Sequence, residues 1–350
     1  MTPTRFAAVI IFAALVFLGS RIFTNINLFR DLPEISYGEC EILRGPLGPE
    51  DITIDHDLER AYIGGDDRRP YIRDGSFDFA QPGTIWSLDL KNPDSQAVLM
   101  QHDLEGPFHP HGIDLLHQTN ELYVVNHTSI YEHEIDVFEI VSATELKLLR
   151  RIQFPQMHAP NDIAVLAQNR FFVTNDHANP RGTLLEKLEV YSTYPGASVA
   201  YFDGENGSIV IDGLRVANGI AISESGKELY VAESTRSTVT RYVREDTNTP
   251  WRKDERINLN SAVDNLEWTQ EGTLLTGAHP KPIDFLAHTS EATNPSPSEV
   301  IEISVTQSPM QAKTILVDDG QKLSGSSAAA RHNGTLLVGV VFEEQLTRCR

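Results

Sequence analysis

Cysteine and positive charge are both scarce in this sequence, and each scarcity excludes a class of function. Only two cysteines occur among the 350 residues, so a cysteine-rich metal centre is excluded. Lys and Arg number 29 against 49 Asp and Glu, and the resulting net charge of -20 would repel the phosphate backbone of a nucleic acid. The composition therefore argues against a nucleic-acid partner and favours cation binding.

Long apolar stretches are scarce as well, and the one at residues 6–18 is short. A helix of about 15 residues spans roughly 22 Å, less than the roughly 30 Å of a bilayer core. We expect residues 1–25 to be a secretory signal peptide or an uncleaved signal anchor, because Phe17 or Leu18 would occupy a cleavage position that favours small residues. Either alternative sends the folded part through the secretory pathway into an oxidising compartment. A retained segment would associate the protein with a membrane or a lipid particle.

The sequence does contain a repeated phrase, in which a small or acidic polar pair precedes an apolar alternating run, a turn and a second apolar run. The six phrases begin at Glu50, His111, Asn161, Asn218, Asp264 and Gly325. Alternation at period two marks strands, and a spacing of about 45 to 60 residues is typical of four-stranded propeller blades. The sequence thus predicts an all-β fold, a six-bladed β-propeller over residues 35–350. A β-sandwich is the weaker alternative, because sandwiches rarely repeat one phrase six times.

The polar pairs that open the phrases should lie where the innermost strands meet the central channel. They supply only oxygen donors: Glu50, Asp51, Asn161, Asp162, Asn218, Asp264 and Asn265. Mixed carboxylate and amide oxygens suit calcium better than zinc or copper. Any one of these residues alone could simply cap a strand end, since Asn and Asp favour turns. Their recurrence at corresponding points favours calcium.

The two cysteines and the glycosylation motifs fit the secretory pathway. Cys40 precedes the first phrase and Cys349 is the penultimate residue, so a disulfide between them would join the chain ends where a propeller closes; two free thiols are the alternative. Glycosylation motifs begin at Asn206 and Asn333 in predicted turns. A third motif begins at Asn126, but its position at a strand end predicts that it carries no glycan.

Eight short motifs give the chain a resemblance to the paraoxonase (arylesterase/lactonase) family. They are GPED at 48–51, PHGI at 110–113, VNH at 125–127, PNDI at 160–163, TNDH at 174–177, ANGI at 217–220, VDN at 263–265 and AHP at 278–280. They occur in the family order and cover essentially the whole mature chain. The resemblance implies a six-bladed propeller with two calcium ions that hydrolyses small-molecule lactones and aryl esters, with phosphotriesters as a promiscuous substrate class.

The resemblance also implies a role for each matched residue. A catalytic calcium that polarises the substrate carbonyl would be held by Glu50, Asn161, Asn218, Asp264 and Asn265. A second, structural calcium would be held by Asp51, Asp162 and the carbonyl of Ile113. In a histidine dyad, His111 would take the proton from the attacking water, and His127 would orient His111 and pass the proton on. Acids on the calcium are the alternative base or nucleophile. His177 and His279 would line the substrate pocket.

Some regions depart from the family pattern and leave alternatives open. Residues 66–79 form a charged, aromatic stretch where paraoxonases carry a variable lid, and either a specificity element or a solvated surface loop fits it. Histidines outside the motifs are expected at the surface, namely His56, His102, His133, His288 and His332. Competing functions are a gluconolactonase-like sugar lactonase with one metal and a noncatalytic propeller like strictosidine-synthase-related proteins. The paired acids favour two calcium ions, and the intact ligand and histidine positions favour catalysis.

Overall fold

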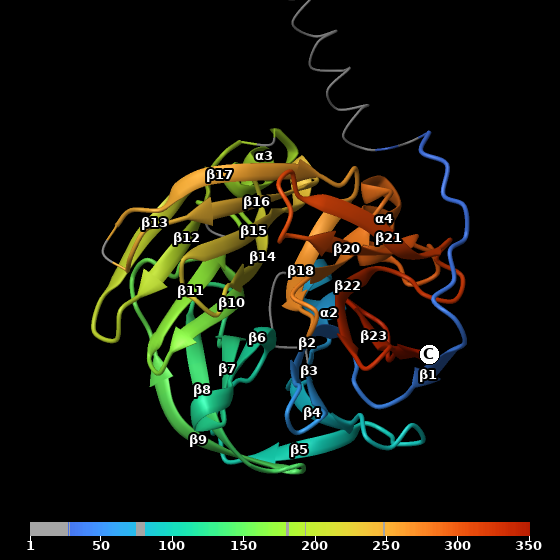
Figure 1. The fold of residues 1–350 in the computed structure, drawn as a ribbon, viewed down its shortest axis with the longest axis horizontal. Coiled ribbons are helices and arrows are strands. Elements are labelled where there is room, and N and C mark those ends of the chain that lie inside the picture. Colours follow the sequence, from blue (N-terminus) through green and yellow to red (C-terminus); the bar gives the residue numbers. More distant parts are fainter. Residues whose placement is uncertain (1–26, 28, 75–80, 180–181, 193, 248) are drawn as a thin grey trace, which may run out of the picture.

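Antiparallel β-sheets stand around a central axis in this protein (Figure 1). The computed structural model describes residues 27, 29–74, 81–179, 182–192, 194–247 and 249–350. Three of the four-stranded sheets are meanders, in which consecutive strands pair with one another. The first contains β10 (Pro160–Ala167), β11 (Arg170–Asn175), β12 (Ala197–Phe202) and β13 (Gly207–Leu214), and the second contains β14 (Ala217–Ile222), β15 (Glu228–Glu233), β16 (Thr238–Val243) and β17 (Arg252–Asn258). The third contains β18 (Ala262–Trp268), β19 (Leu274–His279), β20 (Ser298–Ser304) and β21 (Gln311–Asp318). A fourth sheet joins the two ends of the chain, with β22 (Ser326–His332), β23 (Thr335–Val340), β24 (Leu346–Cys349) and β1 (Cys40–Leu43).

The remaining strands form one eight-stranded sheet. They are β2 (Pro49–Asp55), β3 (Arg60–Gly65), β4 (Thr84–Asp89), β5 (Val98–His102), β6 (Pro110–Leu116), β7 (Glu121–His127), β8 (His133–Ser142) and β9 (Glu145–Ile152). The innermost strands contact one another in the cyclic order β2, β6, β10, β14, β18, β22 and back to β2. The predicted all-β propeller arrangement is confirmed.

The hydrophobic core lies between neighbouring sheets, where the apolar positions of the alternating strands meet. Tyr123 of β7 packs against Phe171 of β11 with 5.8 Å between ring centroids, and Phe171 stacks on Phe202 of β12. Phe171 is fully buried, and full burial of such a side chain contributes about 1.5–3 kcal/mol. Packing between sheets thus holds the inner strands around the channel.

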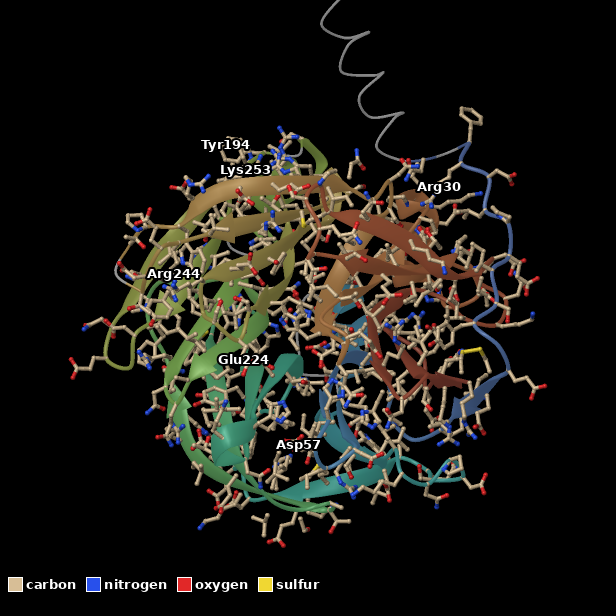
Figure 2. All side chains as sticks on the ribbon, in the orientation of Figure 1. Arg30, Asp57, Tyr194, Glu224, Arg244 and Lys253 are labelled. Atoms are coloured by element: carbon tan, nitrogen blue, oxygen red, sulfur yellow. A yellow bond between two sulfur atoms is a disulfide. The ribbon has the colours of Figure 1, made fainter. Side chains whose placement is uncertain are left out.

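The predicted disulfide is confirmed, and it fastens the ends of the chain. Cys40 and Cys349 are partners in the antiparallel pair of β1 with β24, and their sulfur atoms are bonded (Figure 2). Because β1 supplies the outermost strand of a sheet otherwise built from the C-terminal end, the first and last described strands close the ring together.

Helices are few in the described residues. They are α2 (Arg68–Asp74), α3 (Leu184–Ser192) and α4 (Pro282–Ser290), with the 3-10 turns η1 (His117–Thr119) and η2 (Ser234–Arg236). None of these described helices combines the length and the apolar character needed to cross a bilayer. The predicted signal peptide or anchor at residues 1–25 lies outside the described residues.

Each of the six inner strands has a register irregularity near its start. The irregularities fall between Pro49 and Asp51, Pro110 and Ile113, Pro160 and Ile163, Ala217 and Ile220, Val263 and Leu266, and Ser326 and Ala328. Neighbouring side chains of a regular strand point to opposite faces, and a bulge interrupts that alternation. Both members of a polar pair can therefore face the channel, which is how the repeated phrase builds a site.

Glycine lets neighbouring bulges approach one another. A Cβ added to Gly112 would lie 2.5 Å from the Cα of Asp162, and one added to Gly219 would lie 2.4 Å from the carbonyl oxygen of Asp264. Real Cβ atoms do not approach other atoms so closely, so any larger residue would push two inner strands apart.

Candidate active site

Five oxygen-bearing side chains occupy the bulges at the start of the channel. They are Glu50, Asn161, Asn218, Asp264 and Asn265. Asn265 joins two inner strands, since its Nδ2 donates hydrogen bonds to the carbonyl oxygen of Glu50 at 2.9 Å and to its Oε1 at 3.0 Å. The hydroxyl of Ser327 also donates to the Glu50 carbonyl, at 2.8 Å. The backbone of Glu50 is therefore fixed from two directions.

Several oxygens of these side chains are buried without a hydrogen-bond partner among the described residues. They are Oε2 of Glu50 and Oδ1 of Asn161, Asn218 and Asn265. A buried acceptor left unpaired costs about 1–3 kcal/mol, and native proteins leave few of them. A group of such acceptors at equivalent positions of neighbouring strands fits a bound hard cation, which would satisfy all of them together.

The charges at this end of the channel also favour a cation. Burial raises the pKa of Glu50, the Arg68 guanidinium opposes that rise, and the nearby carboxylates of Asp264 and Asp51 add to it. Within the described part of the chain, no group of three or more His, Cys, Asp or Glu side chains is arranged to hold a metal. The candidate set instead combines two carboxylates with three amides, a mixture that suits calcium rather than zinc.

Asp51 and Asp162 lie next to these donors and tie inner strands together. The Oδ2 of Asp51 accepts a hydrogen bond from the backbone N–H of Ile113 at 2.7 Å, and the Oδ2 of Asp162 accepts one from Ile220 at 2.8 Å. Burial raises the pKa of both carboxyls, and Asp51 raises that of Asp162 further. Carboxylate oxygens have a second lone pair, so these hydrogen bonds leave acceptor capacity for an ion.

The channel continues beyond Asp51 and Asp162 into a cavity of about 470 Å³. Its lining includes these two acids together with Asp114 and Glu267. Glu50 and His111 are not part of the lining, so the large cavity lies on the far side of the candidate site. The two acids Asp51 and Asp162 separate the cavity from the donors at the channel start.

Two histidines meet beside Glu50, as the sequence predicted they could. Nδ1 of His111 lies 2.9 Å from Nε2 of His127, and the planes of the two rings are inclined at 60°. Nε2 of His111 lies 3.6 Å from Oε1 of Glu50. The second ring nitrogen of His127 also has a partner, because its Nδ1 lies 2.9 Å from Nδ1 of His133.

The two expected pocket residues, His177 and His279, are both buried. Nε2 of His279 lies 2.9 Å from Oδ2 of Asp264, and its ring stacks on Phe285 of α4 with 3.6 Å between centroids. His279 thus touches the candidate metal set directly. His177 follows the end of β11, where its Nε2 lies 3.0 Å from Oδ1 of Asp176.

The expectation that the unmatched histidines lie at the surface is wrong for several of them. His288 is 1% exposed and His332 is 3% exposed, and both contact carboxylates, Glu343 and Glu59 respectively. His133 is partly exposed but belongs to the histidine cluster beside Glu50. These carboxylates supply hydrogen-bond partners for the buried rings of His288 and His332.

The described part of residues 66–79 is not a solvated loop. Residues 68–74 form α2, and residues 75–80 lie outside the described residues. Arg68 is buried, donates to the carbonyl oxygen of Pro110 at 2.7 Å, and lies 3.6 Å from Oε2 of Glu50. Sequence reasoning missed Arg68, whose only signal was a basic residue at the edge of the candidate lid.

The three glycosylation motifs differ in accessibility. Asn206 and Asn333 are exposed in turns. Asn126 is fully buried, and its Nδ2 donates hydrogen bonds to Asp136 at 2.7 Å and to the carbonyl of Pro107 at 3.1 Å. The geometry agrees with the prediction that Asn126 carries no glycan.

Comparison with known proteins identifies close sequence relatives. The family model described as Arylesterase matches residues 48–349. The serum paraoxonase/lactonase 3 of Oryctolagus cuniculus is 30% identical over 347 residues, which cover 95% of this chain and 96% of the relative. The serum paraoxonase/arylesterase 1 of Homo sapiens is 30% identical over 344 residues, covering 92% of both chains.

A solved structure shares the fold at much lower sequence identity. A luciferin-regenerating enzyme superposes with a TM-score of 0.55 and 14% identity, covering 89% of this chain and 95% of that protein. At this identity the similarity supports the fold alone.

Proposed function

This chain belongs to the arylesterase family and is an ester-hydrolysing enzyme, and we propose that it hydrolyses lactones and aryl esters at the start of its channel. The observation that carries the assignment of the site is the set of buried oxygens without a hydrogen-bond partner among the described residues, next to the His111–His127 pair. An ester carbonyl needs an electrophile and an activated water, and these two groups of residues would supply them.

In this proposal, a bound calcium ion would supply the electrophile. Its ligands would be Glu50, Asn161, Asn218, Asp264 and Asn265, and a second, structural calcium would bind Asp51, Asp162 and the carbonyl oxygen of Ile113. A calcium ion bound by the first set would act as a Lewis acid on the carbonyl oxygen of the substrate. Arg68 would limit the negative charge of the set, and His279 would hold the orientation of Asp264.

In this proposal, His111 and His127 carry out the proton transfers. His111 would accept a proton at Nε2 from the water that attacks the carbonyl carbon, while His127 holds the ring of His111 through Nδ1. When the bond to the leaving oxygen breaks, His111 would return the proton to that oxygen. His177 would contribute to the wall of the pocket.

We also infer the blade count and the domain organisation. The halves of the eight-stranded sheet are joined by two parallel pairs, Gln101 with Glu145 and His102 with Leu146, whereas all other strands pair antiparallel. Counting each half as a blade gives six, in agreement with the six inner strands. Residues 35–350 would then be one hydrolase domain that follows a signal peptide or anchor at residues 1–25.

The same proposal places the protein in the secretory pathway, supported by the disulfide and by the exposed motifs at Asn206 and Asn333 as glycosylation sites. A retained N-terminal segment would attach it to a membrane or a lipid particle.

Chelation tests the proposal. Complete removal of calcium should lower turnover of a lactone and of a phenyl ester by at least about a hundredfold, the loss typical of removing an oxyanion-stabilising group, and added calcium should restore it. Metal analysis of the purified protein should find calcium.

The substrate panel should include gluconolactone and a phosphotriester. Turnover restricted to gluconolactone would favour a sugar lactonase, and no turnover with calcium bound would favour a binding protein. Turnover indifferent to complete calcium removal would contradict the proposed chemistry.

A further inference from the structure

We propose that His133 is a positioning residue of this enzyme, which fixes the tautomer of His127 and carries protons between the His111–His127 pair and solvent. The proposal rests on the proposed function of that pair and extends it to a third histidine. His133 lies outside every motif shared with the family, so its role comes from its contacts.

The β-hairpin of β7 and β8 brings His133 to its place. His127 ends β7, His133 begins β8, and the two residues are direct partners in the antiparallel register. Side chains at such positions lie on the same face with their Cβ atoms about 4.5–5.5 Å apart. Here the two Nδ1 atoms are 2.9 Å apart and the rings are close to perpendicular.

The two short contacts define a chain of three rings, and only one of its two possible sets of tautomers leaves Nε2 of His111 unprotonated and able to accept a proton. For His111 to accept a proton at Nε2, its own proton must be on Nδ1, from which it donates to Nε2 of His127. His127 must then carry its proton on Nδ1 and donate to Nδ1 of His133. His133 is left with its proton on Nε2. An acceptor at His133 therefore selects the tautomer of His127 that the proposed mechanism needs.

The same chain conducts a proton without a net change in the charge of any ring, while the tautomer of each ring switches. A proton arriving at Nε2 of His111 releases the one on Nδ1 to His127, which releases its Nδ1 proton to His133, which releases its Nε2 proton to water. The reverse transfers deliver a proton to the leaving oxygen and restore the starting tautomers. Each ring gains one proton and loses one, so no other reactant is needed.

Exposure increases along the chain in the direction that a relay requires. The side chain of His111 is 11% exposed beside the 3% exposed side chain of Glu50. His133 is partly exposed at the base of a hairpin whose tip residue Tyr131 is 65% exposed. The chain thus leads from the buried carboxylate toward solvent.

Substitution of His133 with rescue by imidazole tests the proposal. His133→Ala should lower kcat for a lactone by about tenfold with little change in KM, because substrate binding does not involve His133. Imidazole in the buffer should restore much of the lost kcat, since it can occupy the partly exposed space. A purely structural role would not produce rescue. His133→Gln keeps an acceptor for His127 but cannot relay a proton, so its kcat should lie between those of the parent and the alanine variant.

Two control variants separate the failure of this proposal from the failure of the proposed function. His111→Gln should lower turnover by at least about tenfold. Unchanged turnover in folded, calcium-loaded His111→Gln would refute the proposed base. The relay alone would be refuted if His111→Gln loses most of its turnover while His133→Ala keeps the kcat of the parent. It would also be refuted if His133→Ala loses kcat and imidazole does not restore it. His117→Ala removes an exposed histidine that directly follows the inner strand β6 and should leave turnover and its response to imidazole unchanged.

Discussion

Asp136 illustrates how burial changes the chemistry of a single residue in this protein. Its carboxyl is fully buried on β8, where Oδ2 accepts the hydrogen bond from Asn126 and Oδ1 lies 3.5 Å from Nε of Arg151. Burial raises the pKa of Asp136 to about 7, and the adjacent Glu134 adds to the rise. Between about pH 4 and 7, the folded protein therefore keeps a proton on Asp136 that the unfolded chain has released.

This shift makes the free energy of unfolding fall as the pH rises. The pKa of Asp136 in the folded state lies above its ordinary value of 3.8, so the folded state holds more protons than the unfolded state between about pH 4 and 7. Asp136→Asn should remove this contribution and reduce the loss of stability between pH 5 and pH 8 by about 2 kcal/mol. Urea unfolding of both proteins at pH 5 and pH 8, in excess calcium, measures this difference in free energy of unfolding.

The exposed Asp57 provides the control for this prediction. Asp57, labelled in Figure 2, lies in the turn between β2 and β3, and Asp57→Asn should leave the difference between the two pH values unchanged. An equal loss of stability in the parent and in Asp136→Asn would refute the role of the Asp136 carboxyl.

At the scale of elements, α2 and α4 are joined across the start of the channel by Arg69. Its guanidinium lies 2.6 Å from Oε1 of Glu343, 3.2 Å from Nε2 of His288 on α4, and over the ring of Phe342. α4 in turn stacks Phe285 on His279, which contacts Asp264. A continuous set of contacts therefore links the position of α2 to the candidate ligand set.

Arg69→Met should loosen α2 while keeping the apolar part of the side chain. The ion pair is partly exposed and worth up to about 1 kcal/mol, so the KM for a bulky aryl ester should rise about two- to fivefold. The kcat for a small lactone should change little, because the contacts of Arg69 among the described residues are with Glu343, His288 and Phe342 and not with Glu50 or His111. Steady-state kinetics with both substrates measure the effect.

Arg252→Met is the matched control, since Arg252 is a largely exposed arginine 3.9 Å from Asp254 on β17. The same rise in KM in both variants, or no rise in Arg69→Met, would contradict a specific role for the contact between α2 and α4.

At the scale of the whole molecule, ring closure depends on segments from opposite ends of the chain. β1 and β24 pair over four residue pairs, and the disulfide links Cys40 to Cys349 across a sequence separation of 309 residues. In the chain-entropy model, closing a loop of that length stabilises the fold by up to roughly 5 to 6 kcal/mol. β1 is the outermost strand of its sheet and β24 lies next to it, and β23 separates both from the inner strand β22.

The double substitution Cys40→Ala/Cys349→Ala should therefore lower stability without changing kcat. We expect a clear decrease in Tm, with a loss in free energy of unfolding below the roughly 5 to 6 kcal/mol limit because β1 still pairs with β24. Thermal denaturation and lactone kinetics measure the two quantities, and Cys349→Ala alone should match the double variant. An unchanged Tm, or a large loss of kcat, would contradict this separation of closure from catalysis.

The local pattern of this sequence determined its strand repeats, its oxygen donors and the partners of its disulfide. Alternation at period two is a property of neighbouring residues, and the polar pairs stand at corresponding points of each repeat, so both could be recognised before the fold was known. The signal at residues 6–18 and the number of calcium ions remain predictions.

Only the tertiary structure decided which side chains meet. The bulges that let both Asp162 and its neighbour face the channel arise from pairing between strands, and they have no signature of their own in the sequence. His133 was expected at the surface because nothing in its neighbourhood marks it, yet the register of one hairpin places it on His127. Arg68 reaches Glu50 because α2 folds over the channel. Contacts between residues distant in sequence depend on the packing of whole sheets, so composition and local periodicity could not reveal them.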